Sequence, residues 1–405
     1  VHTAVLRNKT LAGKRTWIEL DSGASRHNCE TFRKIIGPKV KLWAVVKSNA
    51  YGHGLFVFSK IINPFIDGFC VDSVLEGLRL RKEGIKKPIL VLGPTLPALY
   101  GKAAKNNITI TISSPETLKA LISFVAKKAT KQRGFPRRFY LPQFHIKIDT
   151  GMHRQGFYLN ELPKVIHLIS NSQFPRQRRV SLGLIISKLT GIFTHFAAAK
   201  DLNNIAYTEK QFLKFKKARQ LFENAGFTNL TAHCAATGAA LLDKKYHLDA
   251  VRIGIGLYGL YPSKELETQF PGIGLWPVLS WRTIISEIKN LKPGDFVGYD
   301  LTERVSRPTK MAILPIGYWH GLARSLSGTG ETLIKDKWAR ILGRISMDIT
   351  AVDATGIRCK IGDIATLIGR NGKKELKARD VAQKAGTIHY EFLTRLNPLI
   401  EKIVL

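Results

Sequence analysis

Short apolar runs alternate with amphipathic segments from about residue 16 to residue 259 of this 405-residue chain. The runs have the length of strands, and Ser73 and Ser114 stand where they can cap two of the helix-like segments. Strands that alternate with helices form parallel sheets, and about eight such repeats predict a (β/α)8 barrel. The apolar runs are residues 17–20, 42–46, 68–71, 88–92, 108–112, 144–148, 191–194, 229–232 and 250–254. The helix-like segments include residues 73–83, 114–127, 161–169 and 208–224.

The pattern changes after about residue 261, where β-rich segments separated by turns follow one another. These segments are residues 278–287, 310–314, 339–344, 349–352 and 363–368, and one helix-like stretch lies at residues 378–385. The predicted fold class is therefore α/β, with an N-terminal (β/α)8 TIM-like barrel and a C-terminal, mainly β domain. We place the barrel at residues 1–262 and the second domain at residues 263–405, with roughly the first 15 residues able to pair with the C-terminal domain.

The chain is strongly basic. Lysine and arginine number 63 against 30 aspartates and glutamates, a formal net charge of +33. Such a field attracts polyanions, but the basic clusters at residues 127–128, 131–138 and 176–179 fall in no recognisable nucleic-acid-binding motif. We therefore expect no specific nucleic-acid partner and attribute the charge to solvated loops or a basic proteome, although its purpose stays open.

Cysteine usage and hydropathy indicate the cellular compartment in which the protein is expected. No run approaches the ~18 apolar residues of a membrane span, so no membrane association is expected. Four cysteines lie far apart without a CxxC pair, which argues against a bound metal or a disulfide framework and favours a reducing, cytoplasmic location. The first residues lack the apolar core of a signal peptide, while the start at Val1 leaves open a leader removed before it.

One lysine directly follows a buried-strand pattern. Residues 44–46, Ala-Val-Val, predict the end of a strand, from which Lys47 would project. A lysine in such a place can form a Schiff base with an aldehyde cofactor. Tyr51 could donate its phenol to a phosphate, and Gly52 and Gly54 allow the backbone to approach closely. Taken alone, a lysine after Ala-Val-Val is more often a surface residue whose amine reaches water.

The run from Lys47 to Gly54, Lys-Ser-Asn-Ala-Tyr-Gly-His-Gly, closely resembles the pyridoxal-phosphate (PLP) lysine segment of the alanine racemases, with Ser48 where alanine is usual. Residues 17–21, 26–28, 75–81, 84–85 and 89–93 resemble further motifs of that family in the same order, so the resemblance covers nearly the whole chain. It implies that PLP is the cofactor, that Lys47 carries it and that Tyr51 contacts its phosphate.

The resemblance assigns roles to residues at two further strand ends. Arg154, in Lys-Ile-Asp-Thr-Gly-Met-His-Arg, would hold the substrate carboxylate or the phenolate oxygen of the cofactor. The lysine that matches Lys147 is often carbamylated in the family and then orients this arginine. His195, in Thr-His-Phe, would lie against the pyridine ring. Outside this context, the arginine would be a surface residue and the histidine a satisfied core residue.

Residues 233–237, His-Cys-Ala-Ala-Thr, depart from the family wording His-x-Ala-Asn-Ser. Thr237 keeps the hydroxyl that is implied to bind phosphate, whereas Ala236 lacks the asparagine amide. The N–H groups of Gly254 and Ile255 are further implied phosphate donors, as is the phenol of Tyr390, which would also border the pocket for the alanine methyl group. The effect of Ala236 therefore stays open.

Arg252 lies in Val-Arg-Ile-Gly-Ile-Gly and by resemblance faces the pyridine nitrogen of PLP. Most PLP enzymes place a carboxylate there, which keeps this nitrogen protonated and makes the ring a strong electron sink. An arginine cannot accept that proton. The resemblance therefore implies an enzyme that returns the substrate α-proton quickly, as racemisation requires, and suppresses transamination.

Residues 296–300, Phe-Val-Gly-Tyr-Asp, match the family segment Val-x-Tyr-Gly, with Asp300 in place of the glycine. Racemisation needs one base on each face of a planar reacting carbon, and the implied pair is Lys47 and Tyr299. In the family a hydrogen-bonded chain through the residues that match His233 and Arg252 supports this tyrosine, which reaches the lysine of the other subunit. The resemblance thus implies a head-to-tail homodimer with its active site at the interface.

Two further segments of the second domain would border the substrate. Residues 315–321 stand where Gly-Tyr-Ala-Asp-Gly is usual, so Tyr318 is retained at the substrate entrance while Trp319 and His320 depart. Residues 343–348 match Gly-Arg-x-x-Met-Asp, which implies that the N–H of Met347 holds the substrate carboxylate with Asp348 nearby.

The predicted function is PLP-dependent racemisation of L- and D-alanine by Lys47 and Tyr299, supplying D-alanine for peptidoglycan. Serine or a broader set of amino acids is the alternative substrate class, because the departures in the second domain leave the pocket shape open and apolar pockets reject a hydroxyl weakly. A non-catalytic PLP-binding protein of the single-barrel kind would lack the second domain and Tyr299. A decarboxylase on the same barrel would need a carboxylate in place of Arg252.

Overall fold

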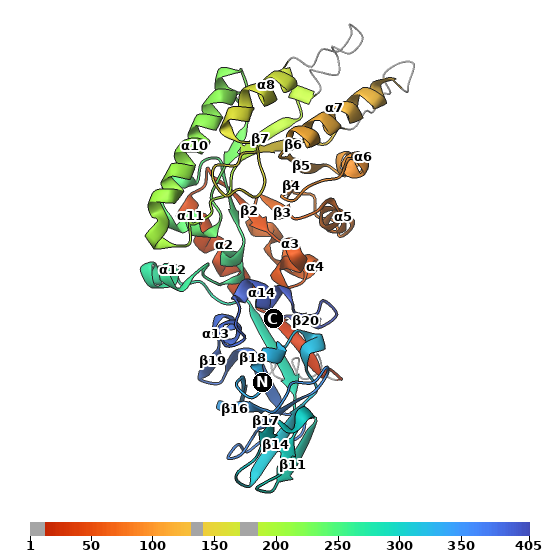
Figure 1. The fold of residues 1–405 in the computed structure, drawn as a ribbon, viewed down its shortest axis with the longest axis vertical. Helices are drawn as coiled ribbons and strands as arrows, with labels where there is room; N and C mark the ends of the chain where they lie inside the picture. The colour runs from red at the N-terminus through yellow and green to blue at the C-terminus, as the bar shows by residue number, and fades with distance from the viewer. Residues whose placement is uncertain (1–12, 131–140, 171–184) are drawn as a thin grey trace. The chain divides into compact units, whose positions relative to one another are not determined.

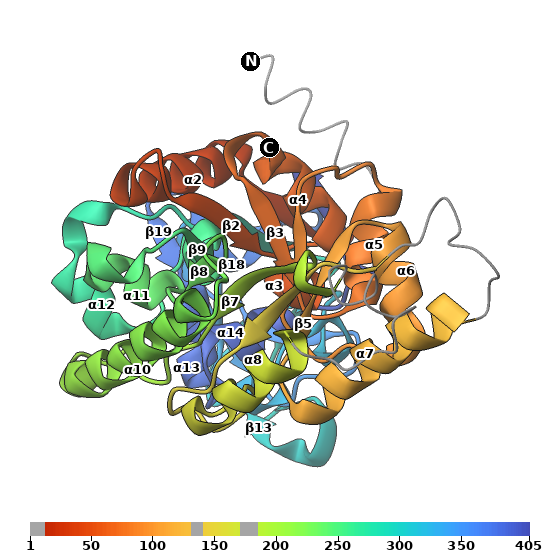
Figure 2. The same ribbon diagram turned by 90° about the horizontal axis from the view of Figure 1, so that it is seen from above.

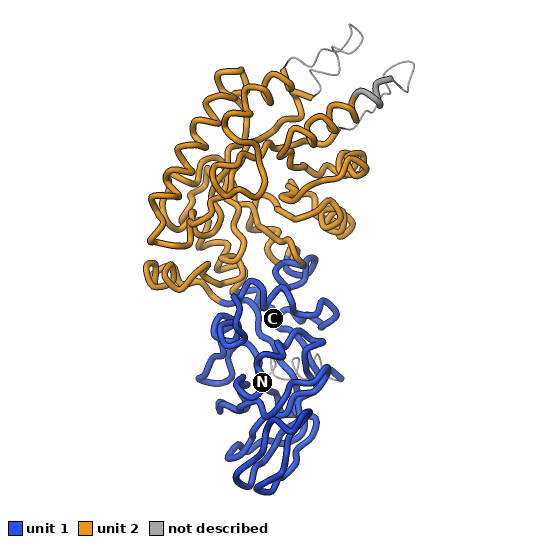
Figure 3. Tube along the Cα trace, in the orientation of Figure 1, with its two compact units in different colours: residues 1–23, 49–58, 277–405 blue, residues 24–48, 59–276 orange. Residues whose placement is uncertain are grey.

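The structure, a computed structural model, describes residues 13–130, 141–170 and 185–405. Contacts group the chain into two compact units, drawn in Figure 3. We call residues 24–48 and 59–276 the barrel unit, and residues 1–23, 49–58 and 277–405 the strand-rich unit. The basic clusters at residues 131–138 and 176–179 lie outside the described residues, as do the side chains of Lys127 and Lys128.

Eight parallel strands of the barrel unit pair in the order β8-β7-β6-β5-β4-β3-β2-β9 (Figures 1 and 2). The two end strands approach each other through a parallel bridge between Ala236 and Arg252 and a hydrogen bond of 3.1 Å from the Asp249 N–H to the Ala232 carbonyl. Their near-continuous apolar sequences suit strands that are buried on both faces. The predicted barrel is confirmed. The strands are β2 (Lys41–Val45), β3 (Gly68–Val71), β4 (Ile89–Val91), β5 (Ile108–Ile112), β6 (Phe144–Lys147), β7 (Leu189–Phe193), β8 (Thr231–His233) and β9 (Ala250–Ile253).

Helices α5, α6, α7, α8 and α10 lie around these strands in Figure 2. Both predicted helix caps are confirmed, because Ser73 Oγ accepts the N–H of Glu76 at 3.3 Å and Ser114 Oγ accepts that of Thr117 at 3.3 Å. The helices between residues 22 and 276 are α2 (Ser22–Ile36), α3 (Lys47–Tyr51), α4 (Leu55–Ile62), α5 (Val74–Lys82), α6 (Tyr100–Lys105), α7 (Pro115–Thr130), α8 (Leu162–Ser170), α10 (Ile205–Asn224), α11 (Thr237–Leu242) and α12 (Lys264–Gln269).

The strand-rich unit holds a ten-stranded, mostly antiparallel sheet in the order β11-β14-β17-β16-β15-β18-β10-β1-β20, with β19 paired to β18. This confirms the mainly β character predicted for the second domain. The strands of this sheet are β1 (Thr16–Leu20), β10 (Leu279–Ile284), β11 (Glu287–Leu291), β14 (Thr309–Leu314), β15 (Glu331–Ile334), β16 (Lys337–Leu342), β17 (Thr350–Asp353), β18 (Ile364–Asn371), β19 (Lys374–Leu376) and β20 (Glu401–Val404). A separate two-stranded sheet consists of β12 (Phe296–Val297) and β13 (Glu303–Arg304). Two helices accompany them, α13 (Ala378–Lys384) and α14 (His389–Thr394).

The apolar run at residues 17–20, which the sequence places among the barrel repeats, belongs instead to the strand-rich unit. Its strand β1 pairs antiparallel with β10 and parallel with β20. Glu19 explains the preference, because this buried carboxylate accepts a hydrogen bond of 3.2 Å from Arg282 Nε on β10. A buried carboxylate needs such a charged partner, and the sequence places this one 263 residues away.

Residues 49–58 also group with the strand-rich unit. Gly52 has φ +84° and sits so close to α14 that a Cβ would lie 2.0 Å from the carbonyl oxygen of Leu393. Gly52 is therefore required twice, for its left-handed backbone and for its lack of a side chain.

Three absences hold for the part of the chain that the structure describes. No helix there combines the length and apolar content that crossing a bilayer requires. Within the same ranges no cluster of three histidine, cysteine or acidic side chains could hold a metal ion. The cysteines Cys29, Cys70, Cys234 and Cys359 are all free and buried.

Candidate active site

The C-terminal ends of the barrel strands gather the charged and aromatic side chains that the sequence singled out. Lys47 follows β2, Lys147 ends β6, His195 follows β7 by two residues, His233 ends β8 and Arg252 lies on β9. Parallel barrel strands end on one face, which is where barrel enzymes carry their sites. The barrel unit thus brings these five residues to a common end.

Lys47 opens a turn that the sequence did not reveal. The residues of α3 after Lys47 have positive φ angles of 54°, 55°, 53° and 51° at Ser48, Asn49, Ala50 and Tyr51. A left-handed turn of non-glycine residues is strained by about 1–2 kcal/mol per residue, and such strain persists where the surroundings impose it. The Lys47 side chain is 39% exposed, and its Nζ lies 3.6 Å from Asp72 Oδ1.

Glu76 holds the start of this turn in place. Its Oε1 accepts the N–H of Ser48 at 2.7 Å, and its Oε2 accepts the N–H of Asp72 at 2.7 Å. One carboxylate on α5 therefore fixes both the backbone next to Lys47 and the backbone of the residue that pairs with it. The sequence pointed to Glu76 only as part of the segment 75–81, without this role.

Arg154 lies in a loop that is shaped by a single carboxylate. Asp149 Oδ1 accepts the N–H groups of Gly151, Met152 and His153 at 2.9, 3.0 and 3.1 Å, and its Oδ2 accepts that of Arg154 at 3.2 Å. This arrangement leaves the Arg154 side chain exposed, without an ion pair to any described residue. A guanidinium in this state is available to an anionic ligand.

Lys147 is buried, and its Nζ donates to Gln155 Oε1 at 2.9 Å. Burial, together with the nearby charges of Arg154 and Arg252, lowers the pKa of Lys147 to about 8. A larger fraction of this amine is therefore neutral near physiological pH than for an ordinary lysine, and the neutral form is the one that reacts with carbon dioxide.

Arg252 is buried and fully engaged inside the barrel. Its Nη2 donates to the carbonyls of Thr194 at 2.8 Å and Cys234 at 3.2 Å, and its Nη1 donates to the carbonyl of His233 at 3.1 Å. Burial lowers the pKa of Arg252, but a guanidinium keeps its charge and acts only as a donor. The barrel therefore presents a fixed cation that cannot accept a proton.

The two histidines beside Arg252 are not equivalent. Both ring nitrogens of His233 are engaged, Nδ1 with Arg252 Nη1 at 2.5 Å and Nε2 with His145 Nδ1 at 2.9 Å. This corrects the expected chain from Tyr299 through His233, because no nitrogen of His233 remains for a phenol. His195 is the alternative, since its Nδ1 lies 3.4 Å from Arg252 Nη2 while its Nε2 bonds to no described residue.

Burial, aided by the charge of Arg252, lowers the pKa of His195 well below its usual value. The imidazole beside the guanidinium is therefore neutral.

The expected phosphate-binding segments lie together in the barrel unit. Thr237 Oγ1 accepts the N–H groups of Gly254 and Gly256, each at 3.3 Å. The Gly254 N–H that the sequence assigned to phosphate is thus directed at a hydroxyl of this chain, whereas the Ile255 N–H bonds to no described residue. Gly256 must lack a side chain, because a Cβ there would lie 2.5 Å from the ring of Phe32.

The other two expected phosphate donors lie together in the strand-rich unit. The ring centroids of Tyr51 and Tyr390 are 6.0 Å apart. Burial raises the pKa of Tyr390, so its phenol stays protonated and can donate to an anion. This pairing joins the lysine segment to α14, which the sequence did not connect.

Tyr299 opens a short helical turn, Tyr299–Leu301, and is 68% exposed. Asp300 takes φ 62°, a conformation that aspartate tolerates better than most residues, and its Oδ2 pairs with Arg344 Nε at 2.6 Å. The departure at Asp300 thus keeps the backbone shape expected of the family glycine and adds an ion pair to the segment 343–348.

The segments that carry Tyr318 and Met347 are joined through their backbones. The N–H of Tyr318 donates to the Ser346 carbonyl at 3.1 Å and that of Trp319 to the Met347 carbonyl at 3.0 Å. Gly317 permits this approach, because a Cβ there would lie 2.1 Å from the Ser346 oxygen. Tyr318 and Met347 are both exposed, and the Met347 N–H bonds to no described residue.

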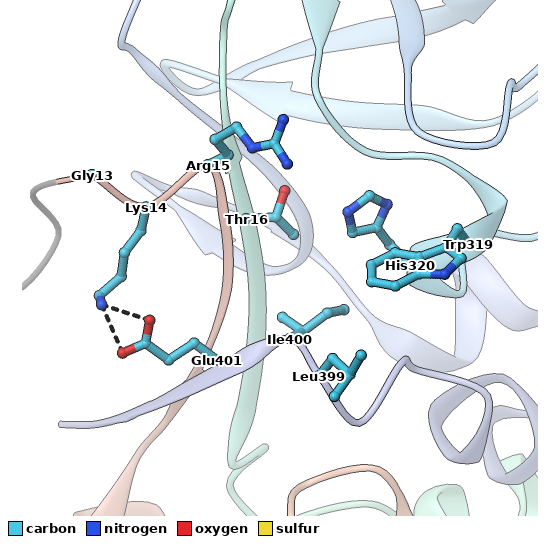
Figure 4. A pocket seen from close by; sticks show the side chains of 9 residues that line it. All are labelled: Gly13, Lys14, Arg15, Thr16, Trp319, His320, Leu399, Ile400 and Glu401. Atoms are coloured by element: carbon cyan, nitrogen blue, oxygen red, sulfur yellow. Dashed lines mark hydrogen bonds and ion pairs between the residues drawn. The ribbon is translucent and has the colours of Figure 1, made fainter.

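The departures Trp319 and His320 line an open pocket of about 350 Å³ in the strand-rich unit, shown in Figure 4. Across it, Lys14 Nζ pairs with Glu401 at 2.6 Å. Burial is the main cause of a lowered pKa of His320, which Asp348 opposes. A neutral imidazole therefore stands where the usual family wording has an aspartate. Arg15, Thr16, Leu399, Ile400 and Gly13 complete the lining.

The residues present fit PLP. The barrel unit offers an amine on Lys47, a buried cation on Arg252 and a hydroxyl on Thr237. These groups match the aldehyde, the pyridine nitrogen and the phosphate of the cofactor, respectively. Asp72, Glu76 and His145 are structural partners of this set that sequence reasoning missed, because each acts through a contact distant in the chain. Asp149 was missed although its contacts are local.

A parallel barrel whose strand ends carry such a lysine, with an arginine in place of a carboxylate deep in the site, defines the class of PLP-dependent racemases. The family model for "Alanine racemase, N-terminal domain" matches residues 20–262, and that for "Alanine racemase, C-terminal domain" matches residues 278–404. The chain belongs to the alanine racemase family.

Individual relatives agree with this assignment. The chain is 35% identical over 398 residues to the alanine racemase of Leptospira interrogans, covering 96% of this chain and 95% of that protein. It is 34% identical to the alanine racemase of Halothermothrix orenii, with 96% of each covered. The crystal structure of alanine racemase from Bacillus anthracis with bound L-Ala-P superposes with a TM-score of 0.82 at 31% identity, covering 97% of this chain and 95% of that one.

Proposed function

We propose that this protein interconverts L-alanine and D-alanine with PLP attached to Lys47, and that it supplies D-alanine for peptidoglycan in the cytoplasm. The observation that carries the proposal is Arg252, a buried cation held by three carbonyls at the strand ends near Lys47. When bound, PLP supplies the covalent attachment and the electron sink that make the α-proton of an amino acid removable. A cation at the pyridine nitrogen limits that sink, which favours return of the proton over side reactions.

The proposed proton carriers are the Lys47 amine on one face of the α-carbon and the Tyr299 phenol on the other. In each direction one group removes the α-proton and the other delivers a proton to the opposite face. His195, hydrogen-bonded to Arg252, is the residue that would hold the phenolic oxygen of Tyr299, which replaces His233 in this role. The exposed guanidinium of Arg154 and the N–H of Met347 would orient the substrate carboxylate, with Tyr318 at the entrance.

We infer a homodimer in which Tyr299 serves the site of the second copy. Tyr299 and Leu301 are 68% and 64% exposed, and they share the strand-rich unit with exposed Phe296, Met347 and Ile349. This exposure leaves Tyr299 and its neighbours in the chain accessible to a second copy. Oligomeric state in solution tests this inference, with a monomer at micromolar concentration as the contrary result.

Serine or a broader set of amino acids stays the alternative substrate class, because His320 and Trp319 change the segment next to Tyr318. Racemase assays on a panel of L-amino acids with added PLP distinguish the classes. We expect alanine to be turned over fastest, and equal rates for alanine and serine would assign the broader specificity. No racemisation of any amino acid by PLP-loaded protein would favour a non-catalytic PLP-binding protein.

Reduction of the PLP-loaded protein with borohydride should fix the cofactor covalently to Lys47. The reason is that the amine projects from the end of β2, exposed and paired with Asp72. Peptide mapping reads the result directly. Lys147, a second lysine at the strand ends, is the internal control and should remain unmodified. Pyridoxyl found on Lys147 instead would exclude Lys47 as the attachment site.

Lys147 should carry a carbamate, which we propose to orient Arg154. Its pKa of about 8 supplies the neutral amine, and Arg154 and Arg252 would stabilise the resulting anion. Carbon-13 NMR of protein equilibrated with labelled bicarbonate should show one carbamate signal that Lys147→Met abolishes.

Lys402 is the matched control for the carbamate, because burial also lowers its pKa to about 8. Its Nζ donates to the carbonyls of Pro398 and Ile400, which would repel an anion. Lys402→Met should therefore leave the signal unchanged. A signal that survives Lys147→Met would contradict the assignment.

A further inference from the structure

A chain of three buried side chains crosses the interior of the barrel, and the proposed roles leave its far end unused. His145 Nδ1 lies 2.9 Å from His233 Nε2, and His233 Nδ1 lies 2.5 Å from Arg252 Nη1. All three residues are buried. The chain thus connects the guanidinium of the proposed active site to an imidazole on β6 that points to no expected ligand.

The chemistry of the three groups fixes where each proton lies. A guanidinium has only donors, so the Nδ1 of His233 must accept from Arg252. A neutral His233 then carries its proton on Nε2 and donates it to His145 Nδ1. His145 in turn carries its own proton on Nε2. The opposite tautomer of either ring would set two donors against each other inside the barrel, where an unpaired donor is costly.

Both imidazoles are held neutral. Burial, with the charge of Arg252 in the same direction, lowers the pKa of His145 to about 3 and that of His233 well below its usual value. Lys41 lowers the pKa of His145 further. The tautomers are therefore the same throughout the pH range in which enzymes of this kind are assayed.

The absence of a side chain at residue 191 leaves room both for the His145 ring and for the Thr231 carbonyl oxygen, which would lie 2.7 Å from a Cβ there. Gly191 on β7 faces the His145 ring, and a Cβ there would lie 2.6 Å from His145 Cε1 and 2.8 Å from Nδ1. Phe193 stacks on the His233 ring at 4.8 Å, and Trp43 lies 5.8 Å from the His145 ring. Both imidazoles are thus confined by packing as well as by their hydrogen bonds.

The other side of His145 meets a cavity of about 210 Å³ at the N-terminal ends of the strands. Thr109, Gln143, Thr190 and Thr231 give this cavity polar walls. A polar cavity of this size has room for several water molecules, and water is the acceptor that the Nε2–H of His145 requires. The chain therefore ends in a place where its last proton can be satisfied.

We propose that His145 is a positioning residue for Arg252. By accepting the Nε2–H of His233, it keeps the Nδ1 lone pair of His233 on the guanidinium and so holds that cation in one orientation. The consequence for catalysis rests on the proposed function, in which Arg252 restricts the reaction to racemisation. The hydrogen-bonded chain itself does not depend on it.

His145→Phe tests the proposal, because it keeps an aromatic ring and removes the acceptor. His145→Asn is the matched control, since its side-chain oxygen stands near the position of Nδ1. In the PLP-loaded enzyme we expect His145→Phe to lower kcat for alanine roughly 10-fold to 100-fold, with KM changed less and with more transamination per turnover. His145→Asn should recover most of the kcat and the wild-type ratio of transamination to racemisation.

Nitrogen-15 NMR of histidine-labelled protein, with and without PLP, supplies a second measurement. In the wild type and in His145→Asn, His233 should have an unprotonated Nδ1 and a protonated Nε2, whereas His145→Phe should mix the two tautomers. An unchanged His233 tautomer in His145→Phe would overturn the proposal. Equal losses of kcat in the Phe and Asn variants would also overturn it, because they would show that His145 contributes only through packing. If the wild type did not racemise alanine, the proposed function would fail, and the NMR comparison would still decide the role of His145.

Discussion

Tyr299→Phe is expected to lower alanine turnover about 10²-fold to 10⁴-fold in at least one direction while PLP stays bound. The change removes the phenolic oxygen but keeps the ring, and Tyr299 is 68% exposed, so folding of the chain should be unaffected. Separate initial rates with L-alanine and D-alanine measure the effect. Near-normal rates in both directions would remove Tyr299 from the catalytic pair.

A mixing experiment gives this prediction a matched control. If Tyr299 serves the Lys47 of the second copy, inactive Lys47→Ala and Tyr299→Phe proteins should complement each other when co-expressed. Random pairing makes about half of the dimers mixed, each with one intact site, so about a quarter of the wild-type activity should return. A chain with both Lys47→Ala and Tyr299→Phe, co-expressed with Tyr299→Phe, is the control and should recover no activity, because no mixed dimer then has an intact site. Absence of any recovery in the first mixture would place Tyr299 and Lys47 of a single chain in one site.

The barrel could be predicted from the sequence because each of its strands has a recognisable local pattern. Runs such as residues 68–71 and 108–112 are apolar, of strand length and bounded by helix starts. The run at residues 17–20 has the same local pattern, yet β1 lies in the other sheet. What decides its place is the pairing of Glu19 with Arg282, and a contact across 263 residues leaves no trace in a local pattern.

The site was predictable as a set of residues but not as an arrangement. The order of the motifs along the chain identified Lys47, Arg154 and Arg252, and the chemistry of each of these residues lies in its own side chain. The left-handed turn after Lys47 was not predictable, because serine, alanine and tyrosine do not favour positive φ and the contact from Glu76 that holds its start comes from α5. His145 was missed for a related reason. A histidine within an apolar strand is usually a core residue, and the partner that gives His145 its role, His233, lies 88 residues away.

Arg252→Glu is expected to change which reaction the protein performs. A carboxylate at this position can accept the proton that a guanidinium cannot, and it would favour protonation of the pyridine nitrogen. Negative charge at the α-carbon would then persist longer. Racemisation should fall by on the order of 10²-fold or more, transamination should become detectable, and an absorption band should appear at the long-wavelength end of the visible.

The substitution Arg252→Glu also disrupts hydrogen bonds inside the barrel. The controls must therefore separate this structural damage from a change in reaction specificity. Arg252 donates to the carbonyls of Thr194, Cys234 and His233, and a carboxylate would face those oxygens without a donor. PLP binding by Arg252→Glu is therefore measured first. Arg252→Lys is the matched variant, because it also loses the planar fork but places no carboxylate beside the ring. It should lose racemase activity without gaining transamination. The contrary result is an Arg252→Glu protein that binds PLP and racemises alanine normally, with neither transamination nor the new absorption band. The charge at residue 252 would then not set the reaction specificity. The proposal that this protein is a racemase would rest on Lys47 and Tyr299 alone.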